Sequence, residues 1–283
     1  MGSNIFRNFS FFSATLSFFL LLGIFTTLFL YSKFSISEFG LGFLVENVWE
    51  VGEDDEGGVF GGLVPIVGTL YATMIAMIVA TPIAMGIAIF LTEVAPDFMI
   101  KPVSVSIELL AAIPSIIYGM WGLFYFAPIV QSFAGGSGMG LLTAGLVLAI
   151  MIIPFMSAIS KDAMNTTPDI LKESAYAMGA TKFEVVKDIV MPYSKAGIIG
   201  SIILALGRAL GETMAVAFLI GSVMRMPESI TDPTTSIPVV LANNFAEADD
   251  LELSSMFYLA LVLFVVSFII ISISKFYFLE RKK

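Results

Sequence analysis

The chain contains no cysteine and no histidine, and only 13% of its 283 residues are charged. The two missing residue types exclude disulfide scaffolds, Cys/His zinc sites, haem ligation by either residue, iron–sulfur clusters and histidine-based catalytic triads. A soluble domain is about one quarter charged, whereas this chain is 58% hydrophobic, so lipid is the expected solvent. The net charge of −9 argues against nucleic acid as a partner.

Six apolar stretches are long enough to cross a bilayer, which takes about 20 residues of helix. They cover residues 9–31, 63–91, 103–130, 140–160, 196–224 and 253–275. The first stretch is longer than the hydrophobic region of a signal peptide and is not followed by a small-residue cleavage site, so we expect a retained span. The predicted fold is all-α: a polytopic membrane protein with six helices in a single transmembrane domain over residues 1–283.

The basic residues predict the orientation of these spans. In a six-span arrangement, Lys33 and Arg225 fall on one side. All the other basic residues outside the spans fall on the opposite side, in the other loops and at both ends. By the positive-inside rule, both termini are cytoplasmic and the protein is a multi-pass protein of the cell membrane. The two longest outer loops are acidic, which we interpret as solvated surface rather than as an ion-binding site. Their acids are Glu46, Glu50, Glu53, Asp54, Asp55, Glu56, Glu228, Asp232, Glu247, Asp249, Asp250 and Glu252.

The predicted cytoplasmic loop, residues 161–195, contains the start and stop signals of two short helices. Thr167 can cap a helix that has Pro168 at its first position, and Gly179 can close that helix in a left-handed conformation. A second helix begins with the capping box Thr181-Lys182-Phe183-Glu184, and Pro192 is expected to end it. Periodicity alone leaves two interpretations of this loop, an amphipathic connector or an element that docks a partner.

Part of this loop resembles a known motif. Glu173-Ser174-Ala175, followed by Gly179, Ile189 and Pro192, is similar to the E-A-A…G…I-x-x-P loop of ABC-importer permeases, with Ser174 in place of the usual alanine. The resemblance implies a type I (MetI-like) permease core over about residues 63–275. It also implies that a coupling helix bearing Glu173, Ala175, Gly179 and Ala180 docks on a cytoplasmic ATPase.

Three ionisable residues lie inside the predicted spans and are therefore functional candidates: Glu108, Arg208 and Glu212. On a continuous helix, Arg208 and Glu212 share a face and can form a structural ion pair. Alternatively they form an anion site, in which the arginine fork binds a tetrahedral oxyanion. The carboxylate would then favour monohydrogen phosphate, whose O–H can donate a hydrogen bond to it, over sulfate, which has no O–H.

Two further segments resemble phosphate-importer permeases, namely residues 207–216, G-R-A-L-G-E-T-M-A-V, and residues 107–119. Residues 237–245, which end in L-A-N-N-F, are similar to the PstC rather than the PstA member of the paired subunits. The resemblance implies that Arg208 and Glu212 belong to the phosphate path. For Glu108 we expect a structural or interfacial role near the cytoplasmic end of the third span.

The function that this resemblance implies is ATP-driven import of inorganic phosphate. The implied partners are a PstA-like second permease, two ATP-binding subunits and an external phosphate-binding protein, with membrane lipid around the complex. The chain has no G-x-x-x-x-G-K-[ST] motif, so it is not expected to be an enzyme or to carry a cofactor, and ATP would bind the partner ATPase. Two alternatives stay open: another oxyanion such as sulfate, molybdate or tungstate, and an ion-driven secondary transporter, although internal repeats typical of the latter are not apparent.

Overall fold

The computed structural model describes residues 2–51 and 58–276, and the described chain is mostly helical, as the all-α prediction requires. It divides into two compact units, the first formed by Met1–Leu63 and Val240–Val266, the second by Val64–Val239 and Ser267–Lys283. The topology prediction used several charged residues that lie outside the described residues. They are Glu53, Asp54, Asp55, Glu56, Arg281, Lys282 and Lys283.

Six helical segments among the described residues are long and apolar enough to cross a membrane, so the predicted number of spans is confirmed. They are Phe6–Tyr31, Leu63–Val94, Ser115–Ala134, Leu141–Asn165, Lys182–Leu210 and Asp250–Lys275. Pro82 and Pro154 lie inside helices, as spanning helices tolerate. The predicted third span over 103–130 is wrong, because the chain leaves the helix at Pro114, which has an extended ψ of 137°.

The first unit begins with α1 (Gly2–Tyr31), α2 (Lys33–Phe39), a 3₁₀ turn (Gly40–Leu44) and a two-stranded antiparallel sheet. The sheet pairs β1 (Trp49–Glu50) with β2 (Val59–Phe60). Residues 240–266, which include most of helix α13 (Asp250–Lys275), supply the rest, and serines join α13 to α2. The Ser35 amide donates to Ser254 Oγ at 3.0 Å, and Ser254 Oγ donates to the carbonyl of Tyr31 at 2.8 Å.

Aromatic side chains form the core of this first unit. Phe43 and Phe60 are buried, and the ring of Phe43 stacks on Tyr258 with the centroids 4.4 Å apart. Trp49 meets Phe60 edge to face at 5.1 Å. Such rings bury a large apolar area in few residues, which explains how so short a sheet is held in place.

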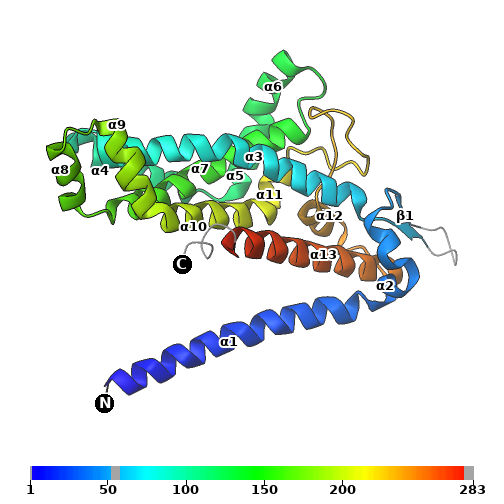
Figure 1. Ribbon diagram of the computed structural model, residues 1–283. Coiled ribbons are helices and arrows are strands. Elements are labelled where there is room, and N and C mark those ends of the chain that lie inside the picture. The colour runs from blue at the N-terminus through cyan, green and yellow to red at the C-terminus, as the bar shows by residue number, and fades with distance from the viewer. Residues whose placement is uncertain (1, 52–57, 277–283) are drawn as a thin grey trace. The chain divides into compact units, whose positions relative to one another are not determined.

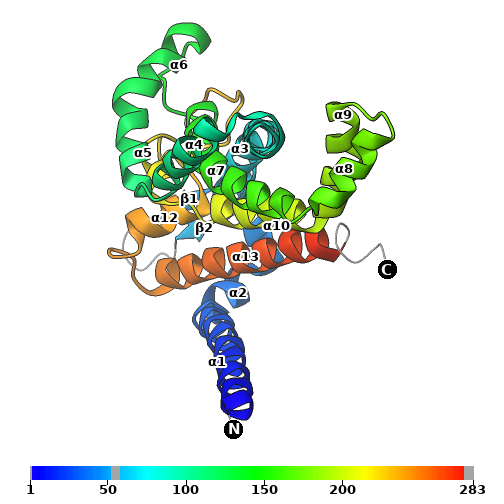
Figure 2. The same ribbon diagram turned by 90° about the vertical axis from the view of Figure 1, so that its left-hand side faces the viewer.

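The second unit contains the remaining helices, shown in Figures 1 and 2. In chain order these are α3 (Leu63–Ile89), α4 (Asp97–Ala111), α5 (Ser115–Trp121), α6 (Ala127–Ala134), α7 (Leu141–Asn165), α8 (Asp169–Ala177), α9 (Lys182–Val185), α10 (Met191–Leu210), α11 (Met214–Ala217) and α12 (Ile237–Asn244). Residues 237–239 of α12 belong to this unit and the rest of α12 to the first. π-Helical turns interrupt the helices at Phe90–Val94, Gly122–Phe126 and Val186–Val190.

Helix α7 is the centre of the second unit and packs against α10, α4, α5 and α11. Figure 2 shows α7 between α4 and α10. Ser160 of α7 and Ser201 of α10 share a hydrogen bond of 2.7 Å, which satisfies both buried hydroxyls. Interhelical hydrogen bonds of this kind and close backbone approach hold helices together where lipid removes the hydrophobic driving force between them.

Helix α3 lies against this centre with a stripe of alanines at four-residue spacing. Residues spaced by four share one face of a helix, and small side chains on that face let a neighbouring helix approach closely. A Cβ built on Gly145 of α7 would lie 2.7 Å from the Cβ of Ile75, so this approach requires glycine. The buried alanines of the stripe are Ala72, Ala76, Ala80, Ala84 and Ala88.

Candidate functional site

The first helix predicted in the 161–195 loop is present as α8, and its C-terminal end has the geometry that the sequence predicts. Gly179 has a φ of +88° and donates its amide to the carbonyl of Tyr176, while the amide of Ala180 donates to the carbonyl of Ala175. These two bonds form a Schellman motif. The predicted N-cap is wrong, because Pro168 occupies the cap position and the buried Thr167 hydroxyl has no hydrogen-bond partner among the described residues.

The predicted capping box of the next helix is confirmed. The amide of Thr181 donates to Glu184 Oε2 at 2.7 Å, and the amide of Glu184 donates to Thr181 Oγ1 at 3.4 Å. The predicted stop at Pro192 is wrong, because the helix continues from Lys182 to Leu210 through a π-helical turn. Pro192 lies in the first turn of α10, directly after the π turn, where its missing N–H costs least.

The four predicted coupling residues divide between two faces of this segment. Ala175 and Ala180 are half-buried and pack on a cluster formed by α3, α7 and α10, whereas Glu173 and Gly179 are exposed. Large apolar side chains are exposed beside them, including Met178 at 88% and Phe183 at 73%. One face is therefore fixed to the helices, and the other is an apolar surface open to a partner.

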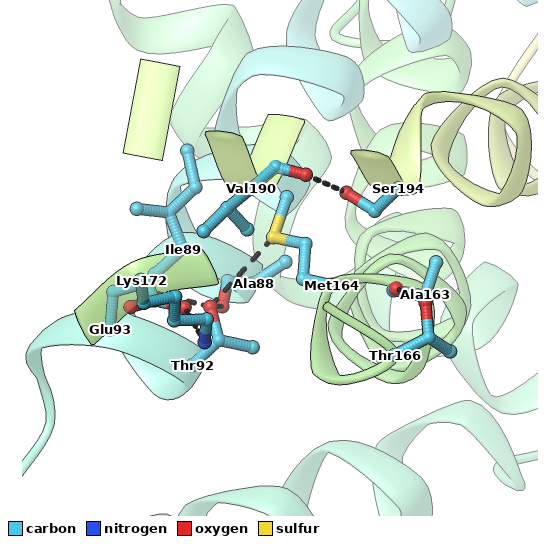
Figure 3. A network of polar contacts seen from close by, with 10 residues as sticks. All are labelled: Ala88, Ile89, Thr92, Glu93, Ala163, Met164, Thr166, Lys172, Val190 and Ser194. Carbon is cyan, nitrogen blue, oxygen red and sulfur yellow. Dashed lines mark hydrogen bonds and ion pairs between the residues drawn. The ribbon is translucent and has the colours of Figure 1, made fainter. Parts of the chain in front are cut away.

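A buried ion pair that the sequence did not reveal also fixes this segment. Lys172 Nζ of α8 lies 2.6 Å from Glu93 Oε1 in the π turn that follows α3, and the two side chains are only 16% and 7% exposed. Figure 3 shows the pair beside the Thr92 hydroxyl, which donates to the carbonyl of Ala88 and contacts the sulfur of Met164. Lys172 and Glu93 are 79 positions apart in the sequence, and local sequence patterns carry no information about a contact over that separation.

The second candidate site, around Arg208 and Glu212, differs from the prediction of one continuous helix over 196–224. Helix α10 ends at Leu210, and the chain turns at Gly211 before the short α11. The two residues are therefore not on one helix face. Among the ion pairs of the described residues, none joins Arg208 to Glu212 or to any other carboxylate. Of the two alternatives for these residues, the structural ion pair is therefore absent among the described residues.

Each of these two side chains has a different neighbour instead. The guanidinium of Arg208 lies 5.4 Å from the ring centroid of Phe155, a cation–π contact that leaves its five N–H donors available. Glu212 Oε1 accepts the amide of Ala215 at 3.2 Å and so satisfies one free N–H at the start of α11. Both side chains are half-buried.

Glu212 also lines a small cavity in the second unit. The cavity has room of about 10 Å³, close to the space of one water molecule. Ser236 Oγ is buried there without a hydrogen-bond partner among the described residues. Thr69 and Thr73 of α3 line the same cavity, together with Ala209 and Leu210 at the end of α10. Sequence patterns did not single out these hydroxyls, because isolated serines and threonines are common in spanning helices.

Glu108, the third ionisable candidate, lies on α4 and is exposed. Helix α4 is not one of the six segments that are long and apolar enough to span, because the break at Pro114 separates it from the third span. The structural or interfacial role expected for Glu108 stays a prediction.

Comparison with known proteins places the chain in a family. A family described as "Binding-protein-dependent transport system inner membrane component" matches residues 84–283. The chain belongs to this family. A relative from Pasteurella multocida, the phosphate transport system permease protein PstC, is 46% identical over 99% of this chain and 92% of its own length. The PstC of Haemophilus influenzae is 45% identical over 93% of this chain and 88% of its own length. The resemblance to PstC-like permeases is thus confirmed.

Solved structures share the fold of this permease. A chain of the MetNI methionine ABC transporter in an inward-facing conformation has a TM-score of 0.60 at 20% identity, covering 75% of this chain and 91% of that one. A chain of a bacterial alginate ABC importer has a TM-score of 0.61 at 15% identity, covering 96% and 98%. The MetI-like permease fold predicted from the sequence is confirmed.

The left-handed turn at Gly179 yields a test of the coupling segment. A Cβ at this position meets no atom within 4 Å, so any effect of substitution comes from the backbone alone. Gly179→Val should cost about 1–2 kcal/mol in the observed turn and displace α8, because β-branched residues avoid positive φ. We expect normal membrane insertion but loss of the stimulation of a partner ATPase by cargo.

The matched control is Gly179→Asn, since asparagine tolerates the left-handed region. It should retain the stimulation of ATP hydrolysis, measured in the purified complex. Equal stimulation in the valine variant would show that the turn does not position a coupling element.

Proposed function

We propose that this permease is a membrane subunit of an ATP-driven importer that carries inorganic phosphate into the cell. The observation that carries the proposal is the identity of 46%, over nearly the whole chain, to a phosphate transport system permease. A relative from Mesorhizobium japonicum, 45% identical over 91% of this chain, has the same name. The family is the membrane component of its transport system, so the permease itself is not the catalytic subunit.

The chemistry of Arg208 supports an anionic cargo. Its guanidinium has no carboxylate within 4 Å among the described residues, so the fork is free to donate bidentate hydrogen bonds to an oxyanion. Glu212 can accept a hydrogen bond from the O–H of monohydrogen phosphate and would repel sulfate, which has no O–H. The cavity beside Glu212 holds about one water molecule, so cargo passage requires the surrounding helices to move apart.

The proposal includes partners that supply energy and cargo. The family name refers to a binding protein, and the chain has no phosphate-cradling loop for ATP, so an ATPase must be a separate subunit. We propose a PstA-like second permease, two ATP-binding subunits and an external phosphate-binding protein. The exposed apolar face around Met178 and Phe183 suits the docking of an ATPase. ATP-driven movement of this face would then expose the cavity to each side of the membrane in turn.

Transport in proteoliposomes tests this function. The permease, reconstituted with its co-expressed partner subunits and binding protein, should take up radiolabelled phosphate only when ATP is present. Excess unlabelled sulfate should compete weakly. Uptake driven by an ion gradient without ATP would support a secondary transporter instead, and strong competition by sulfate would support another oxyanion as cargo.

Two variants test the roles of Arg208 and Glu212 in that assay. Arg208→Lys keeps a cation over Phe155 but loses the fork, so phosphate uptake should fall about tenfold or more, as expected for loss of a charge-assisted hydrogen bond of about 1.5–3 kcal/mol. Glu212→Gln keeps an acceptor for Ala215 and removes the charge, so sulfate should compete better. Wild-type uptake by Arg208→Lys, with unchanged competition in Glu212→Gln, would leave both residues with structural roles.

We also propose that α8 and both termini face the cytoplasm. Lys161, Lys172, Lys182 and Lys187 all belong to the end of α7 or to α8, α9 and the π turn beside them, which lie at one end of the second unit in Figure 1. The positive-inside rule assigns that end to the cytoplasm.

The absence of cysteine makes this orientation testable. Asp249 and Lys182 are both exposed, so a cysteine at either position should be reachable by reagent. Asp249→Cys should react with an impermeant maleimide in intact cells, and Lys182→Cys should react only after permeabilisation. The reverse pattern of labelling would invert the topology.

A further inference from the structure

The Glu93–Lys172 ion pair differs from the other ion pairs among the described residues. Lys161–Asp162 and Lys187–Asp188 join neighbours in the sequence at 3.8 and 4.0 Å, and their carboxylates are exposed. Glu93–Lys172 is shorter, at 2.6 Å, is largely buried and joins two separate helices. Exposed pairs contribute little, whereas separating a buried pair leaves an uncompensated charge. Of these three ion pairs, Glu93–Lys172 is therefore the one whose separation costs the most free energy.

The helix dipoles do not explain the position of either charge. Glu93 lies at the C-terminal end of α3, and Lys172 lies in the first turn and a half of α8. A helix C-terminus disfavours a negative charge, and an N-terminus disfavours a positive one. Each charged side chain thus lies at the helix end where the dipole of its own helix disfavours its charge. The ion pair between the two helices is what stabilises both charges.

The surroundings of the pair contain two π-helical turns. Glu93 belongs to the turn Phe90–Val94, and Val190 of the turn Val186–Val190 is buried in the same cluster as Ala88 and Met164. Figure 3 shows these elements meeting around Met164. Single π turns within helices are frequent at functional sites, and here they lie where α8 contacts α3 and where the α8–α9 segment leads into α10.

Two connections lead from α8 to the cavity beside Glu212. The first is covalent: the helix that starts at Lys182 continues to Leu210 and carries Arg208 in its last turn. The second passes through the ion pair into α3, which carries Thr69 and Thr73 at its other end. Apart from the ion pair, α3 contacts its neighbours through its alanine stripe, with Ile75, Met77 and Val79 beside it, and through the amide of Ile237, which donates to Thr69 Oγ1 at 2.9 Å. Among the described residues, the ion pair is the polar contact that joins this helix to α8.

We propose that the Glu93–Lys172 ion pair is a second mechanical link, which makes α3 move together with the coupling helix α8. The two walls of the cavity, the end of α10 and the start of α3, then open in one step. This inference rests on the proposed function as an ATP-driven importer. Glu93 and Lys172 are positioning residues, since neither touches the cavity.

Charge-neutral and charge-reversed variants test the link in the reconstituted full complex. The measured quantity is phosphate taken up per ATP hydrolysed, together with the basal rate of ATP hydrolysis. The double variant Glu93→Gln with Lys172→Met leaves no unpaired buried charge, so it should assemble and keep its basal rate. Its uptake per ATP should fall about fivefold, in the range observed for residues that couple distant sites.

Reversal of the pair, Glu93→Lys with Lys172→Glu, should restore uptake per ATP to within about twofold, because the contact is re-formed and the helix dipoles favour the reversed charges. Removal of the exposed pair by Lys187→Met with Asp188→Asn is the matched control and should leave the ratio unchanged. Wild-type uptake per ATP in the neutral double variant would overturn the link, as would a reversed pair that assembles but transports no better than the neutral one. A wild-type complex that hydrolyses ATP without taking up phosphate would instead contradict the proposed function.

Discussion

Backbone amides in the hydrocarbon core have no water to bind, and this constraint decides where the chain can leave the helix. Between Leu210 and Ile237 the chain is largely non-helical, yet its backbone groups pair with the start of α7. The amide of Gly140 donates to the carbonyl of Leu219 at 2.8 Å, and that of Leu142 to the carbonyl of Ile230 at 2.7 Å. A Cβ on Gly140 would lie 2.3 Å from the carbonyl oxygen of Thr231. The break that presents Glu212 to the cavity is thus a fixed feature.

Local signals predicted much of the fold, because the interactions that determine those elements are local. The number of spans follows from apolar length, and the Schellman turn at Gly179 and the Thr181–Glu184 capping box involve residues only three to five positions apart. The prediction that Pro192 ends the helix was wrong. It assumed an α-helix, in which a proline lacks the N–H that would bond to the carbonyl four residues back. The π turn before it bonds the amide of Met191 to the carbonyl of Val186, five residues back, and so accommodates the ring.

The site was harder to predict, because its contacts are long-range. The spacing of Arg208 and Glu212 indicated an ion pair only on the assumption of a continuous helix, and the chain turns at Gly211. Glu93 and Lys172 gave no pattern, since their pairing depends on how α3 packs against α8. Ser236 became notable only through its buried, unpaired hydroxyl. In each case the residue types were visible in the sequence, but the tertiary contacts that give them a role were not.

The two interfaces of α8 differ in physical character, and this difference bears on how force enters the bundle. On the inner side, Ala175 and Ala180 pack against the cluster and Lys172 is held by a buried charge. On the outer side, Met178 presents an apolar surface. The π turns at Phe90–Val94 and Val186–Val190 border the inner side, so the segments of helix most able to deform lie next to the point of contact. Beyond them α10 is regular up to Leu210, and a regular helix transmits a displacement along its length with little loss. On the proposed mechanism, a partner that pushes on α8 would change the helix angles at the π turns and move α10 and α3 as whole helices.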